Sequence, residues 1–223
     1  MRDAGEEPEL FTPSEAAVIA DVSLRDINRV IDERILPASA YTSGAKRRIR
    51  PGACPLIYIY FHTAGSFTSE ERSRFITLLW DRGKLDKIKT LRVLKNVRPK
   101  DWTVQKDFFS VDFAEFLRKP LEHYATLRRA REIVEENPDI LGGTPVIRGT
   151  RVPVYDIAAS VAAGIPKNRI LEAYPSLDEH MIDLAVIYAE ATPPRGRPRK
   201  TAPAAYPASA RRVARRVVRR MRT

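Results

Sequence analysis

Residues 137–153 read Asn-Pro-Asp-Ile-Leu-Gly-Gly-Thr-Pro-Val-Ile-Arg-Gly-Thr-Arg-Val-Pro, and this stretch decides how the C-terminal half of the chain is expected to fold. Gly142-Gly143 and Arg148-Gly149 lie on either side of the apolar pair Val146-Ile147, which favours two tight turns around a short extended piece. The prolines before and after this pair remove backbone donors, so the segment is expected to run along the edge of a sheet. The sequence therefore predicts a small β-hairpin, or wing.

Three short helices are expected after the wing. Apolar residues recur with helical spacing over residues 154–163, and Gly164 stands where a helix would end. Pro166 suits the first turn of a second helix, and Ser176 with Glu179 forms a capping box that opens a third. A wing followed by three helices is a winged-helix-like arrangement.

Three runs in this half of the chain carry a family resemblance. Residues 142–154 read Gly-Gly-Thr-Pro-Val-Ile-Arg-Gly-Thr-Arg-Val-Pro-Val, Ala163 precedes Gly164, and residues 174–177 read Tyr-Pro-Ser-Leu. Together, over roughly residues 130–191, they resemble a small prokaryotic winged-helix family of unknown function. That family is represented among VapB-type antitoxins and is frequently encoded beside a PIN-domain ribonuclease. The resemblance implies the antitoxin role of a type II toxin–antitoxin system, with a PIN-domain ribonuclease toxin as partner.

The third of these helices is expected to pack against protein and not to enter a DNA groove. Its polar positions are mostly acidic, and phosphates would repel them. They are Asp178, Glu179, His180, Asp183 and Glu190. Dimerisation or docking of the toxin is the expected role of this domain, although Arg148 and Arg151 in the wing could contact phosphates.

The N-terminal segment is expected to form a helix-turn-helix. Residues 14–20 predict a short apolar helix, residues 21–23 a tight turn, and residues 24–35 a second helix with an apolar inner face. The pattern resembles the excisionase and MerR-type variety, in which a β-strand wing follows the second helix. Asp21 departs from that pattern, because a glycine is common at this turn.

If the second helix enters a major groove, the outward residues near its start would contact DNA, and the basic run that follows would press on the backbone. Arginine can fork onto guanine, asparagine onto adenine, and serine reaches phosphate. The predicted DNA-binding residues are Ser23, Arg25, Asn28, Arg29, Lys46, Arg47, Arg48 and Arg50. The alternative is a solvated helix face with a basic loop, which Asp26, Asp32 and Glu33 favour.

The middle segment, residues 55–112, is expected to be mixed α/β. Residues 56–61 are rich in isoleucine and tyrosine and predict a strand. Thr68 with Glu71 forms a capping box that opens a helix, and Gly83 would end it. The basic stretch that follows, residues 85–97, is open between a strand, a short helix and a loop.

Another strand is predicted over residues 102–113, and a helix from about Phe113 towards Arg129, bent or reset by Pro120. The aromatic side chains of the middle segment could stack on bases, but a core role is favoured. They are Tyr58, Tyr60, Phe61, Trp80, Trp102, Phe108 and Phe109.

Catalytic and metal-binding motifs are not found. The three histidines, His62, His123 and His180, are far apart, and the sequence has no phosphate loop, nucleophile elbow or dinucleotide fingerprint. The single cysteine, Cys54, excludes an internal disulfide and is expected to be a small, partly buried residue. We therefore expect a protein that is not an enzyme and binds no cofactor or metal. No signal peptide and no spanning apolar run are visible, so a cytoplasmic protein without a membrane partner is expected.

The excess charge lies in the C-terminal tail. The chain has a net charge of +11, and residues 192–223 hold eleven basic residues and no acid, while the remainder has 28 basic and 28 acidic residues. Residues 192–207 are proline-rich and expected to be extended or disordered, and residues 194–200 resemble an AT-hook, which places arginines in an A·T-rich minor groove. From Ala210 an apolar stripe faces paired arginines, which predicts a helix that folds only on a partner.

An arginine of this tail could instead pair with the metal-binding carboxylates of a PIN nuclease and inhibit it. The predicted toxin-binding residues are Arg195, Arg197, Arg199, Arg211, Arg212, Val213, Arg215, Arg216, Val217, Arg219 and Arg220. An anionic membrane is the rival surface for such a helix, and a solvated tail that adheres to nucleic acid is the plain alternative.

The sequence thus predicts an α+β, mainly helical fold with a tail that is disordered when alone. The expected domains are a helix-turn-helix with basic wing (11–52), a mixed α/β segment (55–112), a winged-helix antitoxin-like domain (113–191) and a basic tail (192–223). The expected function is an antitoxin that neutralises a PIN-domain ribonuclease and, as a homodimer or within a larger toxin–antitoxin assembly, represses its own operon at operator DNA. The alternative is a transcriptional regulator or architectural DNA-binding protein without a toxin.

Overall fold

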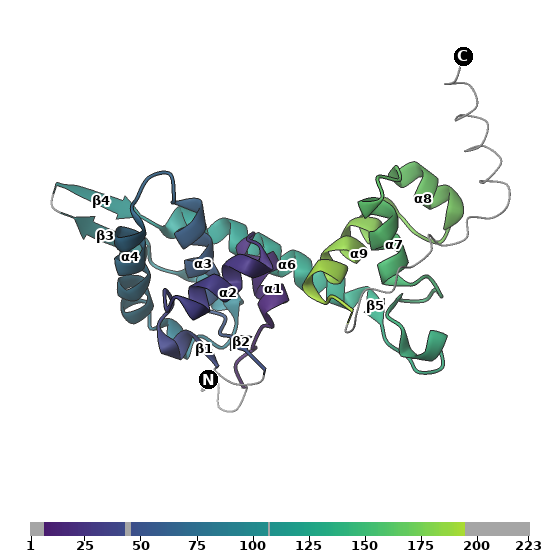
Figure 1. The fold of residues 1–223 in the computed structure, drawn as a ribbon, viewed down its shortest axis with the longest axis horizontal. Coiled ribbons are helices and arrows are strands. Elements are labelled where there is room, and N and C mark those ends of the chain that lie inside the picture. Colours follow the sequence, from purple (N-terminus) through teal and green to yellow (C-terminus); the bar gives the residue numbers. More distant parts are fainter. Residues whose placement is uncertain (1–6, 43–45, 107, 195–223) are drawn as a thin grey trace, which may run out of the picture. The chain divides into compact units, whose positions relative to one another are not determined.

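The computed structural model describes residues 7–42, 46–106 and 108–194. Two compact units make up this part of the chain, and the main division between them falls after Arg129 (Figure 1). Helices dominate both units, and the described strands form three two-stranded antiparallel sheets. The expected α+β, mainly helical fold is therefore confirmed. Within the described residues, no helix is both long enough and apolar enough to cross a membrane.

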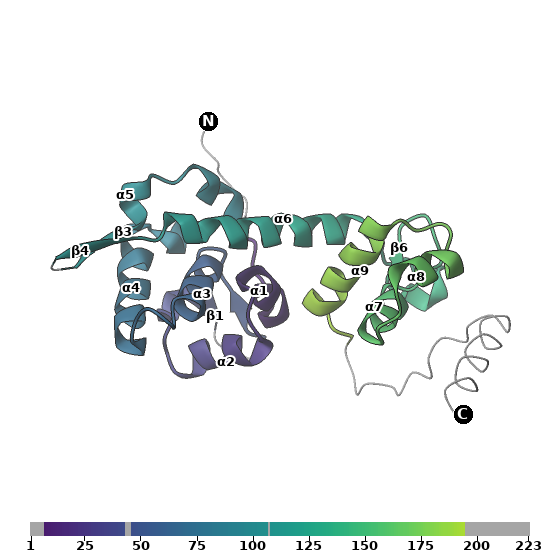
Figure 2. The same ribbon diagram turned by 90° about the horizontal axis from the view of Figure 1, so that it is seen from above.

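The first unit begins with two helices joined by a three-residue turn, α1 (Pro13–Ala20) and α2 (Leu24–Asp32). Each begins with a capping box that satisfies backbone N–H groups of its first turn. The paired residues are Thr12 with Glu15 and Ser23 with Asp26. The helices pack against each other, as Figures 1 and 2 show. Both helices expected here are present, and the second ends at Asp32 instead of continuing to residue 35.

Asp21 forms the turn between these helices in a left-handed conformation, with φ 50°. This conformation costs least for glycine, but aspartate tolerates it better than most residues. The Val22 N–H donates to the Ala17 carbonyl, and His62 Nε2 donates to the Asp21 carbonyl at 3.2 Å. The turn therefore forms without the glycine that is common there.

A short hairpin follows α2 and joins the core. Its strands β1 (Tyr41–Thr42) and β2 (Arg48–Ile49) are antiparallel, with Tyr41 opposite Ile49. On its other side Ile49 exchanges two backbone hydrogen bonds with Phe11, at 2.8 and 2.9 Å, and both side chains are fully buried. The basic hairpin is thus fixed to the same core as α1 and α2.

The prediction of a strand over residues 56–61 is wrong, because this segment lies in helix α3 (Ala53–His62). Seven of the ten residues of α3 are buried, so its sequence lacks the broad polar face that reveals a helix. Pro55 lies in the first turn, where its missing N–H leaves no intrahelical bond unmade. Cys54 in α3 is fully buried, where only partial burial was expected, and burial raises the pKa of its thiol.

The helix expected after Thr68 is α4 (Ser69–Arg82), and the capping box of Thr68 with Glu71 is confirmed. Gly83 caps its C-terminus, as expected, but with an ordinary φ of −75°. The next residue, Lys84, takes the left-handed conformation instead, with φ 47°. The stretch left open by the sequence then forms two 3-10 turns, η2 (Leu85–Lys87) and η3 (Leu91–Asn96).

A second hairpin and a long helix complete this unit. After a single helical turn, α5 (Pro99–Trp102), the single strand predicted over residues 102–113 is in fact two strands, β3 (Thr103–Lys106) and β4 (Phe109–Asp112). A 3-10 turn, η4 (Ala114–Leu117), precedes α6 (Arg118–Glu132). Pro120 lies in the first turn of α6, so it resets the helix as expected.

Of the seven aromatic side chains expected in the core, three are buried, while Tyr58 and Phe61 are half-buried. Tyr60, Trp80 and Trp102 are at most 3% exposed. Phe108, at the tip of the β3–β4 hairpin, contradicts the expectation because it is fully exposed. A residue at a two-residue hairpin tip points away from any sheet face, so alternation along the strand does not decide its burial.

Leu85 is 1% exposed and packs between two glycines that have no room for a side chain. A methyl group on Gly52 would lie 2.5 Å from the Leu85 carbonyl oxygen, and one on Gly83 would lie 2.9 Å from the Leu79 carbonyl oxygen. Both obstacles are backbone atoms, which cannot rotate away. The close approach of α3, α4 and η2 therefore depends on these glycines.

We expect Gly52→Ala to lower the free energy of unfolding of the first unit by about 1–3 kcal/mol, because it overpacks the contact with Leu85. Gly65→Ala is the matched control, since a methyl group there meets open space. Urea denaturation followed by tryptophan fluorescence measures this unit alone, because both tryptophans of the chain, Trp80 and Trp102, lie in it. Equal stability of the two variants would contradict this packing.

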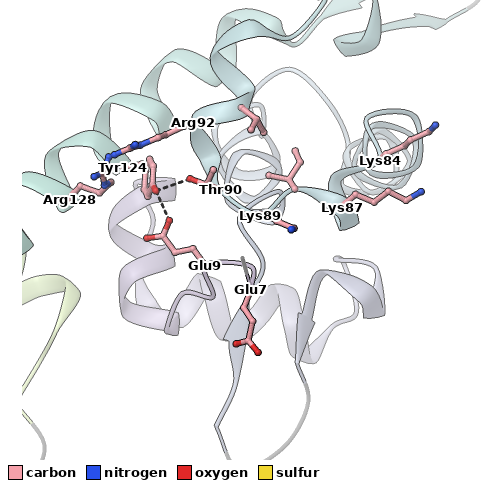
Figure 3. A pocket seen from close by; sticks show the side chains of 11 residues that line it. Glu7, Glu9, Lys84, Lys87, Lys89, Thr90, Arg92, Tyr124 and Arg128 are labelled. Carbon is pink, nitrogen blue, oxygen red and sulfur yellow. Dashed lines mark hydrogen bonds between the residues drawn. The ribbon is translucent and has the colours of Figure 1, made fainter. Parts of the chain in front are cut away.

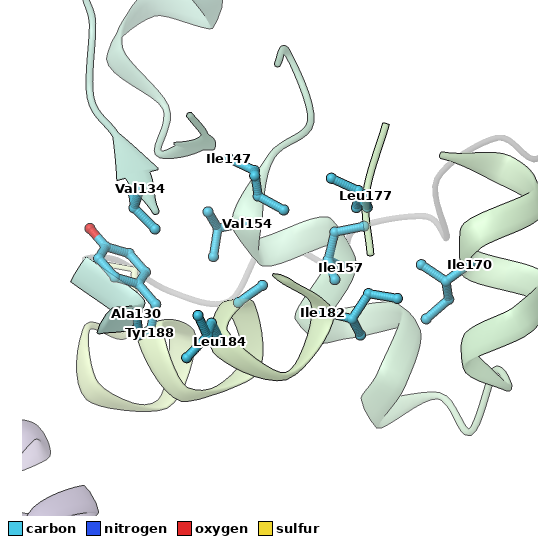
Figure 4. Packing of buried hydrophobic residues seen from close by; sticks show 11 residues of the cluster. Ala130, Val134, Ile147, Val154, Ile157, Ile170, Leu177, Ile182, Leu184 and Tyr188 are labelled. Atoms are coloured by element: carbon cyan, nitrogen blue, oxygen red, sulfur yellow. The ribbon is translucent and has the colours of Figure 1, made fainter. Parts of the chain in front are cut away.

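The second unit consists of a small sheet followed by three helices. The sheet pairs β5 (Val134–Glu135) with β6 (Val146–Ile147), and a 3-10 turn lies between them. The turn and helices are η5 (Leu141–Gly143), α7 (Val154–Ala162), α8 (Lys167–Ala173) and α9 (Glu179–Ala191). The wing and the three helices predicted from the sequence are therefore confirmed. Their buried side chains, including Ile147, Val154 and Ile182, form one core (Figure 4).

The glycines of the wing adopt the turn conformations predicted for them, but the prediction that this segment lies at the edge of a sheet is wrong. Gly142, Gly143 and Gly149 all have positive φ, and the last lies in the turn after β6. β6 pairs with β5 on one side and, through Val146 opposite Pro153, with the following extended residues on the other. β6 is thus central, and its two flanking prolines are accommodated because one precedes the strand and the other lies on the outer segment.

The start of α9 differs from the predicted capping box. The Met181 N–H donates to Asp178 Oδ1 at 2.7 Å, so Asp178 and not Ser176 provides the cap. At the other side of the core, the Tyr188 hydroxyl donates to Glu136 Oε1 at 2.8 Å. Burial and this hydrogen bond raise the pKa of Tyr188, which keeps the hydroxyl protonated as a donor.

Candidate nucleic-acid interface

The exposed start of α2 presents Arg25 as an unpaired cation. Arg25 is the second residue of the helix and is exposed, and within the described ranges it has no ion-pair partner. Ser23, the other residue predicted to touch DNA here, is the N-cap, and its Oγ accepts from the Asp26 N–H at 3.1 Å. Its hydroxyl also donates to the Asp26 carboxylate at 2.6 Å. Ser23 therefore has a structural role that the DNA prediction did not include.

One turn further along, Arg29 is exposed but paired. Its Nε lies 3.1 Å from both carboxylate oxygens of Glu33, four residues on in the same helix. Both side chains are about half exposed, at 51% and 53%, so water screens the pair and it stabilises the helix little. A DNA phosphate could replace Glu33 at low cost.

The hairpin is joined to α2 through Arg47. Its guanidinium lies 2.9 Å from Asp32 Oδ1 and donates to Asn28 Oδ1 at 3.4 Å. Asn28 and Asp32 are four residues apart and so share one face of α2. Of the predicted DNA-binding residues, the structure therefore brings Asn28 and Arg47 into direct contact.

The remaining basic residues lie along the hairpin. Lys46 is exposed and has no ion-pair partner in the described part of the chain. The Arg48 N–H donates to Thr42 Oγ1 at 3.1 Å, and the guanidinium donates to the Arg47 carbonyl at 3.4 Å. Arg50 is half-buried, and its N–H donates to the Ala40 carbonyl. These bonds hold the basic run in an extended form beside α2.

The charge balance of this region is positive. Residues 21–50 contain seven basic and four acidic residues, and Asp32 and Glu33 each contact an arginine. These acids had favoured a solvated face over DNA binding, but Asp32 instead fixes the hairpin to α2. That role was missed, although its four-residue spacing from Asn28 was visible in the sequence.

The acidic residues predicted to keep α9 from DNA are all exposed. They are Asp178, Glu179, Asp183 and Glu190. Asp183 lies 2.5 Å from Lys167 Nζ at the start of α8. In the wing of this unit, Arg151 is exposed and a guanidinium nitrogen of Arg148 donates to the Val134 carbonyl at 3.4 Å.

All the predicted toxin-binding residues, from Arg195 to Arg220, lie outside the described residues. In the described part of the chain, no group of three or more metal-ligating side chains gathers. His62 and His123 contact backbone carbonyls, those of Asp21 and Ile19. These contacts are of the structural kind expected for lone histidines.

Comparison with known proteins finds relatives for most of the chain. A family described as "Protein of unknown function (DUF433)" matches residues 134–189. The "Uncharacterized protein y4eO" of Sinorhizobium fredii is 53% identical over 191 residues, which cover 86% of this chain and 85% of that protein. The crystal structure of Rv2018 from Mycobacterium tuberculosis aligns at 17% identity with a TM-score of 0.33, over 80% of this chain and 99% of that chain. The family of unknown function falls where the sequence resembled one, and that part of the resemblance is confirmed.

Proposed function

The chain belongs to the same family as protein y4eO of Sinorhizobium fredii, and from this premise we propose that it is a DNA-binding repressor that also serves as the antitoxin of a PIN-domain ribonuclease. The observation that carries the DNA-binding part is the contact of Arg47 with Asn28 and Asp32, because it unites the basic hairpin with α2.

In this proposal α2 enters the major groove by its N-terminal end, where Arg25 contacts the bases. A helix is the element that fits the major groove, and arginine makes the commonest specific contact, to guanine. The hairpin lies beside the helix and carries Lys46, Arg48 and Arg50, which neutralise phosphates and set the register. Base contact from α2 and backbone contact from the hairpin together supply specificity and affinity.

In this proposal the second unit packs against another protein and does not contact DNA. The exposed acids of α9, such as Glu179 and Asp183, suit a protein surface better than a phosphate backbone. We assign this unit to dimerisation or to contact with the toxin. A dimer would double the helix-turn-helix and so read two half-sites.

The antitoxin part rests on the sequence of the tail and on the family resemblance. Residues 195–223 carry all the excess positive charge of the chain. An extended arginine can pair with the clustered carboxylates of a metal-dependent nuclease and exclude its metal. The runner-up function is a regulator without a toxin, in which the same tail lies in the minor groove of A·T-rich DNA.

The DNA-binding proposal is tested by selecting fragments of the gene's own upstream region with the full-length chain, followed by footprinting. We expect one protected region with an inverted repeat whose half-site centres are about 10 base pairs, or a multiple of this, apart. Affinity for that site should fall steeply with salt, and non-specific duplex of equal length should bind at least about 1,000-fold more weakly.

A matched duplex with one half-site scrambled is the control for the dimer. Its affinity should fall towards the non-specific level, because only one helix can then read its bases. Equal binding to all duplexes, with no protected region, would contradict operator recognition and leave a chain that binds DNA through charge alone.

A further inference from the structure

A basic pocket of about 690 Å³ lies in the first unit (Figure 3), and its lining residues include none of those predicted to bind DNA. Its walls come from residues 84–93, from α6, and from the extended residues that precede α1. Five of its lining side chains are basic, against two carboxylates. The basic residues are Lys84, Lys87, Lys89, Arg92 and Arg128.

Three of these cations form no ion pair with any residue that the structure describes. Lys84, Lys87 and Arg92 are exposed, and no carboxylate among the described residues forms an ion pair with them. Other arginines of this unit do find acids, as Arg74 does with Glu70 at 2.6 Å and Arg98 with Asp101 at 2.9 Å. Like charges gathered around a concave surface raise the local positive potential, which an anion would lower.

Lys84 is held in the pocket at a conformational cost. Its left-handed backbone, with φ 47°, is one that a side chain with a Cβ atom rarely adopts. The glycine that would relieve the strain stands one residue earlier, where Gly83 is needed for close packing against Leu85. Strained residues of this kind cluster at ligand sites, and here the strain places an unpaired ammonium at the rim.

The opposite end of the pocket is fixed by a hydrogen-bonded chain. The Tyr124 hydroxyl donates to Glu9 and accepts from Thr90 Oγ1 at 3.1 Å. Burial and the contact with Glu9 raise the pKa of Tyr124 to about 12, so the phenol stays neutral. Figure 3 shows this chain at the end away from Lys84 and Lys87. The Glu9 carboxylate is therefore held apart from those two unpaired ammonium groups.

We propose that this pocket binds a small organic polyphosphate of nucleotide size. The three unpaired cations match a chain of phosphates, and the apolar side chains of Ile88 and Val93, the latter 53% exposed, offer a surface for the organic part. The volume lies within the roughly 300–1,000 Å³ range of small-molecule sites, and a concave wall suits a compact anion better than a duplex backbone. This inference does not depend on the DNA-binding or antitoxin function.

The test is calorimetric titration of the full-length chain with ATP and with inorganic tripolyphosphate, in magnesium-free buffer at moderate salt. The pocket variant is Lys84→Gln/Lys87→Gln/Arg92→Gln. The control variant is Arg34→Gln/Lys95→Gln/Lys100→Gln, which removes the same residue types from exposed, unpaired positions of the same unit. Both variants keep the basic tail, so its non-specific binding of anions is common to every titration.

We expect a one-site component for ATP in the wild type and in the control, weakened at least about thirtyfold in the pocket variant. Equal weakening in both variants would overturn the proposal, because general electrostatics would then account for binding. Equal affinity for tripolyphosphate and ATP would overturn recognition of the organic part. If the pocket variant loses affinity for duplex DNA but not for ATP, the cations serve a DNA backbone and the proposal is wrong. Thermal melts of all three chains confirm that the variants fold.

Discussion

Charge reversal at Arg25 is expected to weaken binding of the specific DNA site by about 100-fold or more. Arg25 stands exposed in the first turn of α2 and, in the described part of the chain, has no ion-pair partner that would compete for it. A bidentate arginine contact with guanine contributes about 1–3 kcal/mol of discrimination. Arg25→Glu removes that contact and adds repulsion from nearby phosphates.

Arg34→Glu is the matched control for this prediction. Arg34 is also exposed and unpaired within the described residues, and its reversal changes the net charge of the chain equally. It follows the far end of α2, where a groove-entering helix leaves the bases. Fluorescence anisotropy with specific and scrambled duplexes, at several salt concentrations, separates the two effects. An equal loss in both variants would mean that α2 contributes charge and reads no sequence.

Charge reversal at Arg25 tests DNA recognition more specifically than charge reversal at Arg29, although both residues were predicted to contact DNA. Reversing Arg29 would place a second carboxylate four residues before Glu33 in the same helix, and the repulsion would destabilise α2 itself. In the second unit, Asp183→Asn removes the exposed ion pair with Lys167 but leaves the Asp178 cap of α9 intact, and DNA binding should be unchanged. These choices keep effects on recognition apart from effects on folding.

The elements that could be predicted from the sequence are those with local signals. Thr68 with Glu71 opens α4, and the glycines of the wing take the positive φ values that its turns need. Each such signal involves residues close together in the chain. Helices α1, α2, α4 and α7 therefore begin and end within about three residues of their predicted bounds.

The segments that were predicted wrongly lack such local signals. α3 was predicted as a strand because it is buried on almost every side, and its periodicity is lost when no face is polar. The turn between β3 and β4 contains Phe108 and lacks the glycine or asparagine that usually reveals a tight hairpin, so two strands were predicted as one. Burial and tertiary contact decided both segments.

In the candidate sites, too, residues with a local signal could be predicted, and contacts between distant residues could not. Residue type and helical position were enough to choose Arg25 and Asn28, but the contact of Arg47 with Asp32 joins residues fifteen positions apart. The basic pocket is assembled from three segments distant in the chain, so no local pattern could predict it. The sequence revealed only that residues 85–97 are basic.

A chain that ends at Pro194 is expected to lose toxin neutralisation completely while it retains binding to its operator. The truncation removes eleven basic residues and no acid, which leaves 28 of each sign. Every residue that the structure describes remains, including α1, α2 and the β1–β2 hairpin. The measurements are growth rescue on co-expression with the cognate nuclease, and the affinity of each chain for the operator.

A scrambled tail is the matched control for this truncation. Keeping the composition of residues 210–223 but destroying the spacing of its apolar residues retains the charge and removes the amphipathic stripe. Neutralisation by the scrambled chain would mean that charge alone blocks the nuclease. Failure of both altered chains would mean that a helix folded on the toxin is required.

The operator measurement on the same chains distinguishes the two candidate functions. If the tail serves an A·T-rich minor groove, the chain ending at Pro194 loses DNA affinity and much of its salt dependence, because counterion release scales with the number of phosphate contacts. If the tail serves a toxin, specific DNA affinity and the footprint survive, since α2 and the hairpin are intact. A truncated chain that neutralises the nuclease fully would contradict the antitoxin mechanism, and one that loses operator binding would establish the tail as a DNA-binding element.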